Sequence, residues 1–241
     1  MLHKTRGIVL HQINYSETSV IAKIYTEQFG LQSYIIRGVR KAKSKIKRNL
    51  LQHLSPVDMI VYHKEKSNIQ NIKEIKANFQ LQSIPFEITK GSIAIFINEI
   101  LYKSVKEEEA NPNLFEFIFN SVKLLDETKD KYINFHLLFM IHLTKFLGFF
   151  PRGNYSPVKT FFDMEEGVFC GSKPLHGNYI KEPISRKFFD LLKTELPDHT
   201  SVCLNQKERQ EILQKLIDYY CLHLPVFKGI KSHHILREVL E

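Results

Sequence analysis

The segment GIVLHQINYSETSVIAKIYTEQFGLQSYIIR, residues 7–37, decides how the N-terminal part of the chain folds. It alternates runs of apolar and β-branched residues with polar turns, which is typical of short antiparallel strands. Two similar runs follow, and imperfect alternation in the second predicts a bulge. Together these patterns predict five strands, over residues 7–13, 19–26, 31–37, 57–63 and 69–79. Five strands in about 80 residues indicate an OB-type barrel, and a small SH3-like barrel would show the same pattern.

From Pro85 onward the apolar residues recur with the period of helices. The pattern predicts six helices, over residues 88–105, 113–126, 132–147, 185–194, 205–222 and 233–240. The third helix is almost wholly apolar and precedes Gly148, a C-cap residue, so we expect it at the centre of a helical domain. Two pairs of residues indicate helix N-termini. Asn111-Pro112 is an N-cap followed by a first-turn proline, and Asn205 with Glu208 is a variant of the capping box.

Residues 149–183 interrupt the helices with eight Pro or Gly residues and predict a small hairpin. The fold class that follows is α+β with two domains. The first is an OB-fold nucleic-acid-binding domain over residues 1–80. The second is an all-α helical domain over residues 81–241, with the loop-rich insert at about 149–183.

The charge of the chain is concentrated in its first third. Residues 1–80 hold 14 basic and 5 acidic side chains, a net of +9, whereas residues 81–241 hold 20 and 21, a net of −1. The excess centres on RGVRKAKSKIKR, residues 37–48, where seven of twelve residues are Lys or Arg and none is acidic. A basic module joined to a near-neutral one indicates that a polyanion binds at one end of the chain.

Composition limits the class of protein. With 241 residues, 43% of them hydrophobic, the chain can bury a substantial core. The sequence predicts no transmembrane helix and no secretory signal. Three cysteines far apart in sequence favour a reducing compartment, so we expect a cytoplasmic protein.

The sequence lacks the common catalytic motifs. It has no phosphate-binding GxxxxGK[ST] loop, no GxGxxG, no HExxH and no GxSxG. The spacing of its 11 histidines does not suggest a metal site, and His136 and His142 lie in an apolar helix where core histidines are common. Three acidic residues could form a pair of catalytic carboxylates, but acids grouped in this way are more typical of a solvated hairpin tip: Asp163, Glu165 and Glu166. We therefore expect no catalytic residue, no cofactor and no enzyme.

The basic run is the strongest functional signal. A charge run is often only a solvated loop, but this one lies between two strands of a barrel, with Tyr15, Tyr25 and Tyr34 nearby. OB barrels bind single strands with a cationic groove and aromatic rings on which bases stack, although Tyr25 and Tyr34 could equally belong to the core. Seven phosphate contacts would give a slope of log K against log[salt] of roughly −5. The candidate nucleic-acid-binding residues are Arg37, Arg40, Lys41, Lys43, Lys45, Lys47 and Arg48, with Lys4, Arg6 and Tyr34 beside them.

Two segments resemble a known family. GIVL…NYSETSVIAKIYTEQFGLQSYIIRGVRKAKSK resembles the opening of bacterial RecO proteins, in which a G(I/V)VL strand precedes a Tyr- and Glu-containing stretch and a basic loop. KFLGFFPRGNYSPVKTFFDMEEGVF resembles the later segment of that family that runs from an LG pair to FD and G.F. The resemblance spans essentially the whole chain.

The resemblance implies an OB-fold domain, a helical domain and a recombination mediator of DNA repair, cytoplasmic and associated with the nucleoid. Proteins of this family bind single- and double-stranded DNA and anneal complementary strands. With RecR, and often RecF, they help to load RecA onto DNA coated by single-strand-binding protein. They contact the C-terminal tail of that protein through the helical domain; candidate tail-binding cations here are Lys123, Lys145, Arg152 and Arg186.

The chain departs from the family at one place. Many members carry four cysteines as a zinc site in the insert, whereas here residues 151–155 replace the first pair and only Cys170 remains of the second. One thiol cannot build a tetrahedral S4 site. We therefore expect no bound metal, with the degenerate, zinc-finger-like insert held by Phe161, Phe162 and Phe169.

Two other functions remain compatible with the residues. The basic loop could dock an acidic protein tail, which would make the chain a protein-interaction adaptor. A barrel of this kind could also bind RNA without annealing activity. Binding assays with oligonucleotides of each type and with an acidic peptide distinguish these hypotheses.

Overall fold

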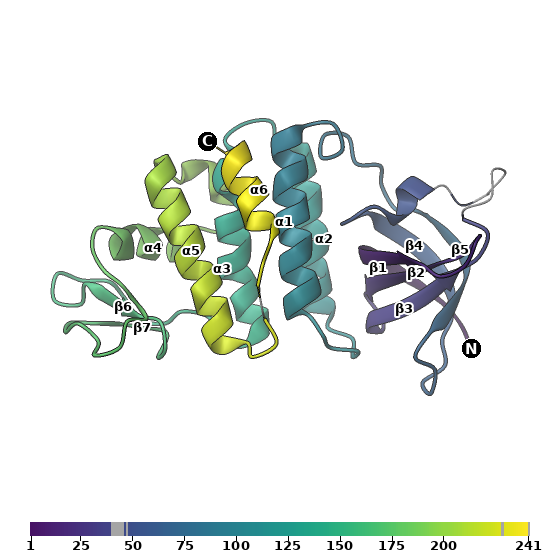
Figure 1. Cartoon of the computed structure of the whole chain (residues 1–241), viewed down its shortest axis with the longest axis horizontal. Helices are drawn as coiled ribbons and strands as arrows, with labels where there is room; N and C mark the ends of the chain where they lie inside the picture. Colours follow the sequence, from purple (N-terminus) through teal and green to yellow (C-terminus); the bar gives the residue numbers. More distant parts are fainter. Residues whose placement is uncertain (40–45, 47, 228, 241) are drawn as a thin grey trace. The chain divides into compact units, whose positions relative to one another are not determined.

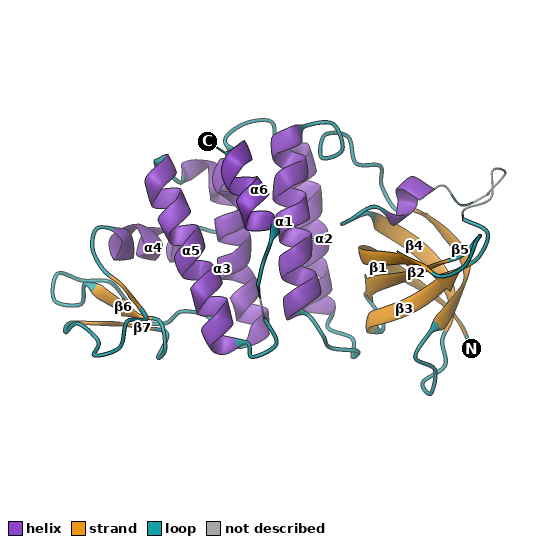
Figure 2. Cartoon of the chain, viewed as in Figure 1, coloured by secondary structure: helices purple, strands orange, loops and turns teal. Residues whose placement is uncertain are grey.

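The structure is a computed structural model, and it describes residues 1–39, 46, 48–227 and 229–240. The chain divides into two compact units (Figure 1). The barrel unit comprises residues 1–86 and 105–126, and the helical unit comprises residues 87–104 and 127–241. Figure 2 shows strands in the barrel unit and mostly helices in the helical unit, apart from the small sheet of the insert.

The barrel is a closed sheet with the strand order β1-β2-β3-β5-β4. Its strands are β1 (Leu2–Asn14), β2 (Val20–Thr26), β3 (Gly30–Ile36), β4 (Pro56–Tyr62) and β5 (Gln70–Ala77). All neighbours pair antiparallel except β3 and β5, which pair in parallel over only two residue pairs. This five-stranded barrel confirms the predicted OB fold. The predicted bulge is also present, because the β4–β5 register shifts between Ile60 and Val61.

Alternating residues of each strand fill the barrel interior. Val9, Ile24, Tyr34, Val57 and Met59 are each at most 2% exposed and belong to one apolar cluster. Their neighbours along the strands face outward and are more polar, as the two-residue period of a strand requires. The five predicted strands are therefore confirmed; β1 differs in beginning at Leu2, because its first residues pair with the end of β4.

Helix α2 (Pro112–Glu127) belongs to the barrel unit up to Asp126, whereas sequence analysis assigned it to the helical domain. The reason is its aromatic face. Phe115 stacks on Tyr25 of β2 with ring centroids 6.4 Å apart, and Phe119 meets Phe79 at 5.5 Å. The guanidinium carbon of Arg6 lies 5.0 Å from the centroids of both Phe115 and Phe119. The helical period of the sequence shows that α2 has an apolar face, but it does not show whether this face packs against the barrel or against other helices.

Asp126 fixes the segment that leaves the barrel. Its carboxylate accepts the backbone N–H groups of Gln82 at 2.8 Å and of Ser83 and Ile84 at 2.9 Å each. Burial would raise the pKa of Asp126, but these hydrogen bonds lower it below the ordinary value. The carboxylate thereby supplies the acceptors that this irregular backbone needs.

The helical unit is built around α3. Its helices are α1 (Ile88–Ser104), α3 (Phe135–Leu147), α4 (Ile184–Lys193), α5 (Gln206–His223) and α6 (Ser232–Val239). Residues 135–144 of α3 are all buried, and α3 contacts α1, α4 and α5, which confirms its predicted central position. Gly148 ends the helix in the left-handed conformation, and Asn205 with Glu208 forms the capping box of α5. Among the described residues no helix is both long and apolar enough to cross a membrane.

The insert forms a three-stranded sheet in the order β7-β6-β8. Strands β6 (Phe161–Asp163) and β7 (Val168–Cys170) form the predicted hairpin, and β8 (Tyr179–Ile180) is an additional strand. Phe162 is fully buried, with its ring centroid 5.0 Å from that of Phe169 and 4.9 Å from that of Phe188 on α4. Phe161 is half-buried and packs edge-on against Tyr179. Aromatic packing therefore attaches this sheet to α4.

Helix α6 is attached to α1 through a single carboxylate. Glu99 accepts the backbone N–H groups of Lys231 at 3.1 Å and Ser232 at 2.8 Å, at the N-terminus of α6. It also accepts from the Ser232 hydroxyl at 2.5 Å and pairs with the Lys103 ammonium at 2.8 Å. Burial raises the pKa of Glu99, but the hydrogen bonds from Lys103 and Ser232 outweigh it and lower the pKa to about 2.

The change Glu99→Gln is therefore expected to lower the free energy of unfolding by about 2 kcal/mol at pH 7, because donors at the start of α6 lose a charged acceptor. A carboxyl whose pKa is lowered on folding stabilises the folded state above pH 4.5, and this contribution disappears as the pH falls toward 2. The deficit of the variant should therefore shrink between pH 4.5 and pH 2. Urea unfolding at several pH values measures it, with the exposed Glu238→Gln on the same helix as control. A deficit independent of pH would contradict this account.

Candidate nucleic-acid interface

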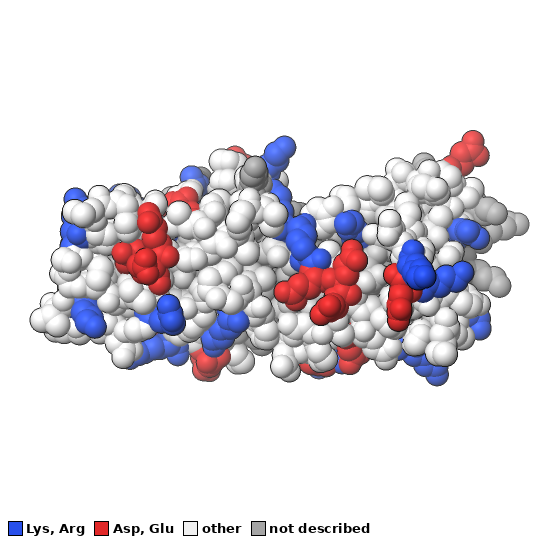
Figure 3. Space-filling model, turned by 90° about the horizontal axis from the view of Figure 1, so that it is seen from below, with Lys and Arg blue, Asp and Glu red and all other residues white. Residues whose placement is uncertain are grey.

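Most of the predicted basic run lies outside the described residues. This applies to Arg40, Lys41, Lys43, Lys45 and Lys47, whose assignment as phosphate contacts stays a prediction. Of the rest, Arg37 follows β3 and is exposed, and Arg48 begins the 3-10 helix Arg48–Leu51. In the space-filling view of Figure 3, basic side chains of the barrel unit are interspersed with a few acidic ones. The surface beside the run is therefore described in its own right.

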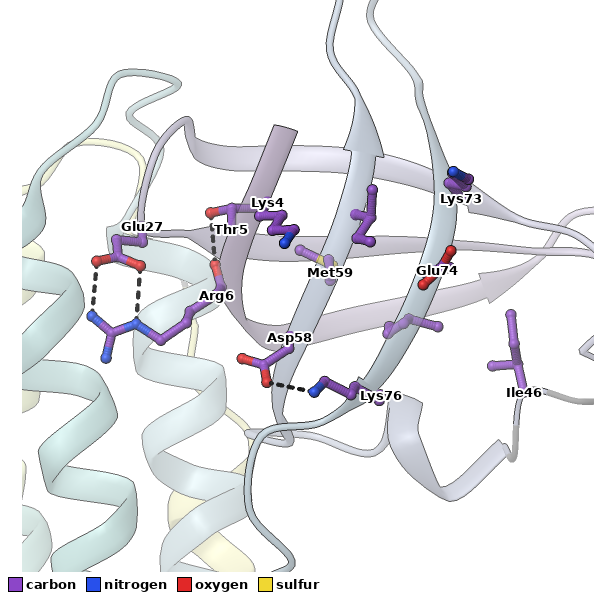
Figure 4. Close-up of a pocket in the computed structure, with 12 residues that line it drawn as sticks. Lys4, Thr5, Arg6, Glu27, Ile46, Asp58, Met59, Lys73, Glu74 and Lys76 are labelled. Atoms are coloured by element: carbon purple, nitrogen blue, oxygen red, sulfur yellow. Dashed lines mark hydrogen bonds and ion pairs between the residues drawn. The ribbon is translucent and has the colours of Figure 1, made fainter. Parts of the chain in front are cut away.

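A first hollow of about 790 Å³ lies on the outer face of β1, β4 and β5 (Figure 4). Antiparallel pairing sets the residues that share this face: Lys4 lies opposite Ile60, and Ile60 opposite Glu74. The next row consists of Arg6, Asp58 and Lys76. Basic and acidic side chains alternate here, and the Lys76 ammonium lies 3.7 Å from a carboxylate oxygen of Asp58. The first hollow is thus of mixed charge, with Lys4 as its exposed cation from the predicted set.

Arg6 is the first correction to the predicted site. Its guanidinium donates to both carboxylate oxygens of Glu27, at 2.9 and 2.8 Å, and forms an ion pair with Glu116 of α2. The hydrogen bonds to Glu27, more than any other interaction, raise the pKa of Arg6 and lower that of Glu27. With two carboxylates and two phenyl rings around it, Arg6 joins β1 to α2.

A second hollow, of about 410 Å³, lies where β3 and β5 separate. Parallel pairing joins these strands only at Tyr34–Gln70 and Ile35–Asn71, so the sheet opens beyond the end of β3. Arg37, Lys64 and Lys73 line this hollow together with the ring of Tyr62, and no acidic residue among those that the structure describes does so. Lys73 and Ile46 line both hollows, which makes the two hollows adjacent parts of one surface.

The bulge in β5 explains how Lys73 reaches both hollows. Ile60 pairs with Glu74 and Val61 with Ile72, so Lys73 is the extra residue without a partner across the strand. A bulge changes the direction of the side chain that it carries. The imperfect alternation read from the sequence thus marks a cation at the junction of the hollows.

Tyr34 is the second correction. Its side chain is 0% exposed and lies within the barrel cluster, so its ring cannot stack on a base. Tyr25 is also 0% exposed, but its ring is covered by Phe115 of α2. The alternation of VDMIVYH, with Val57, Met59 and Val61 inward, places Tyr62 outward instead, where it is 45% exposed. Tyr62, Lys64 and Lys73 lie far from the basic run in sequence, so neither the density of charge nor the nearness of aromatic residues to the run indicates them.

The four candidate partner-binding cations do not belong to one unit. Lys123 lies on α2 of the barrel unit, whereas Lys145, Arg152 and Arg186 belong to the helical unit. The Lys145 ammonium lies 3.8 Å from Glu195 and 5.0 Å from the ring centroid of Phe150. Arg186 lines a third hollow, of about 610 Å³, together with Tyr155 and Phe189.

The insert does not offer a set of metal ligands. Among the described residues no group of three His, Cys, Asp or Glu side chains is placed to hold a metal ion. Cys170 donates through its thiol to the Ser172 carbonyl oxygen at 3.3 Å, and the other two cysteines lie outside the insert. His176 lies 3.3 Å from Asp163 and 3.5 Å from Glu165, a polar contact that closes the hairpin tip. These residues do not fit a tetrahedral zinc site.

We expect the purified protein to contain less than one zinc per chain, and treatment with a chelator to leave its melting temperature unchanged. A structural zinc site contributes directly to folding free energy, so removing a real one would lower that temperature strongly. Metal analysis by mass spectrometry and a thermal melt with and without chelator make the measurement. Stoichiometric zinc that survives dialysis would contradict it, and Cys170→Ser would then show whether the thiol is a ligand.

These features define the class of protein first: an OB-fold barrel with a cationic outer hollow, joined to a helical unit, is an architecture that nucleic-acid-binding proteins use. Family models then match both parts. The family described as Recombination protein O N terminal matches residues 1–79, and Recombination protein O C terminal matches residues 85–232. The chain therefore belongs to the RecO family.

Full-length relatives agree with the family models. A protein of Phocaeicola vulgatus named DNA repair protein RecO is 36% identical over 239 residues, which cover 99% of both chains. Proteins of the same name from Bacteroides fragilis and Flavobacterium psychrophilum are 34% and 36% identical, over 100% and 98% of both chains. The chain is thus similar to these relatives across both of its units.

Proposed function

We propose that the chain is a mediator of DNA repair and homologous recombination. In this role it binds single- and double-stranded DNA, anneals complementary strands and helps to load RecA onto DNA coated by single-strand-binding protein. Its partners are a RecR-like protein, the tail of single-strand-binding protein and, in the loading step, RecF and RecA. It acts in the cytoplasm at the nucleoid, and no catalytic step is needed for this role.

The observation that carries the proposal is the second hollow of the barrel. Among the described residues, three cations and an exposed ring line it and no acidic side chain does; Arg37 and Ile46 of the basic run are among the lining residues. Phosphate contacts of this kind supply affinity without reading sequence. A mediator that anneals any pair of complementary strands requires such a surface.

The helical unit supplies a surface for the protein tail. The third hollow combines the rings of Tyr155 and Phe189 with the Arg186 guanidinium. An aromatic residue and a carboxylate of an acidic peptide would suit this combination, although Glu182 and Asp190 line it too. The hydroxyl of Tyr155 donates to the Glu182 carboxylate, and this hydrogen bond partly compensates the negative charge of Glu182. Lys145 and Arg152 are the further cations proposed for this unit.

An annealing assay tests the proposal. Two complementary strands are each coated with single-strand-binding protein, and duplex formation is followed with and without the chain and a RecR-like protein. Faster annealing in the presence of the chain supports the proposal, whereas annealing at the rate of the coated strands alone would overturn it. Replacing one DNA strand by RNA, and adding a peptide with the acidic tail as competitor, separates the RNA-binding and adaptor functions from the mediator function.

A further inference from the structure

We propose that the second hollow holds a base of bound single-stranded DNA, stacked on the ring of Tyr62. The cations of the hollow then contact the phosphates on either side of that base. The inference rests on the proposed function, because it assigns a residue to DNA binding by the barrel. It identifies an aromatic contact in addition to the electrostatic one.

The first support is the exposure of the ring. Tyr62 ends β4, is 45% exposed and lines the hollow, whereas Tyr25 and Tyr34 are fully buried. The exposed Tyr15 lies in the turn after β1 and lines neither the first nor the second hollow. Any base can stack on such a ring because each base has an aromatic face. The volume of about 410 Å³ is within the range of pockets that enclose small ligands, roughly 300–1,000 Å³.

The second support is the charge around the ring. Arg37, Lys64 and Lys73 line the second hollow and are exposed, and in the described part of the chain no acidic side chain lines it. The first hollow contrasts with it, because Glu27, Asp58 and Glu74 line that surface. A single strand carries a phosphate on each side of every base. A ring bordered by cations therefore matches one nucleotide unit better than it matches an apolar peptide or a neutral ligand.

The third support is the rigid loop that carries Lys64. Gln70 is 2% exposed, and its side chain accepts the backbone N–H of Lys64 at 2.9 Å. It donates to the carbonyl oxygens of Lys64 and Ser67, each at 2.8 Å. These three hydrogen bonds fix the β4–β5 connection next to Tyr62. A loop that is already ordered loses less conformational entropy on binding than a flexible one.

The experiment uses a fluorescent ring at this position. The chain contains no tryptophan, so Tyr62→Trp introduces a single reporter, and Tyr15→Trp gives a matched control on the same unit. Each variant is titrated with a labelled oligothymidine, with binding measured by anisotropy and stacking by quenching of tryptophan fluorescence. We expect binding by both variants, strong quenching for Tyr62→Trp and little for Tyr15→Trp. A blunt DNA duplex should quench Tyr62→Trp far less, because its bases are already stacked.

The outcomes separate the two proposals. If anisotropy reports binding but Tyr62→Trp is not quenched, or is quenched equally by duplex, the stacking inference is wrong while DNA binding stands. If neither variant nor the unaltered chain binds the oligonucleotide, the proposed function itself fails. Tyr62→Ala should weaken binding about 10-fold with an unchanged salt slope, and Tyr62→Phe should bind like the unaltered chain, because stacking needs the ring and not the hydroxyl. A loss with Tyr62→Phe equal to that with Tyr62→Ala would overturn the stacking role.

Discussion

Changing Arg37, Lys64 and Lys73 together to Glu is expected to lower the affinity for single-stranded DNA about 100-fold at 0.1 M salt. Each of these exposed cations attracts a phosphate with about 1 kcal/mol in water, and a total of about 3 kcal/mol corresponds to that factor. Three lost contacts should also flatten the slope of log K against log[salt] by about 2, because each single-strand contact contributes about 0.7. Anisotropy titrations between 50 and 300 mM salt measure both quantities.

The control must change the net charge by the same amount elsewhere. Lys129, Lys181 and Lys207 are exposed on the helical unit, and their triple change to Glu alters the charge equally. If this control loses as much affinity as the hollow variant, DNA responds to total charge and the second hollow is not its site. If the triple change of Arg37, Lys64 and Lys73 left the slope of log K against log[salt] unchanged, that result would also show that the second hollow is not the DNA site.

The local chemistry of the strands and helices could be predicted from the sequence, but their partners could not. Alternation predicted the five strands and the bulge, and the apolar character of residues 132–147 predicted α3 as the centre of its unit. These features depend on residues close together in the chain. The assignment of Phe115 and Phe119 to the barrel depends on contacts with Tyr25 and Phe79, which no local pattern encodes.

The candidate site shows the same limit. The density of Lys and Arg marked residues 37–48, and Arg37 does line a hollow. Arg6 looked equivalent in sequence, but the pairing of β1 brings it to Glu27 and Glu116. Tyr34 lies close in sequence to the basic run and was therefore predicted to stack on a base, but its position on β3 points its side chain into the barrel core. Tyr62 and Lys73 reach the hollow only because β4, β5 and β3 close the barrel.

Gly30→Ala is expected to lower the free energy of unfolding of the barrel unit by about 3 kcal/mol or more. Gly30 opens β3 with φ of 60°, and an added Cβ would lie 2.7 Å from the carbonyl oxygen of Glu107 and closer still to that of Glu109. The Glu107 oxygen also accepts the N–H of Leu31 at 2.9 Å, so the backbone cannot move away without losing this bond. Left-handed backbone in a residue with a side chain costs about 1 kcal/mol or more, and the clash with fixed backbone adds to it.

Gly148→Ala separates the two contributions. Gly148 also has a positive φ, of 85°, but an added Cβ there meets nothing within 4 Å. Its change to Ala should therefore cost only the conformational part, about 1 kcal/mol. Urea unfolding of both variants and of the unaltered chain, followed by circular dichroism, gives the comparison. Equal losses would mean that the segment 107–109 yields to the new methyl group, and that its contact with the start of β3 is not the constraint that makes glycine necessary there.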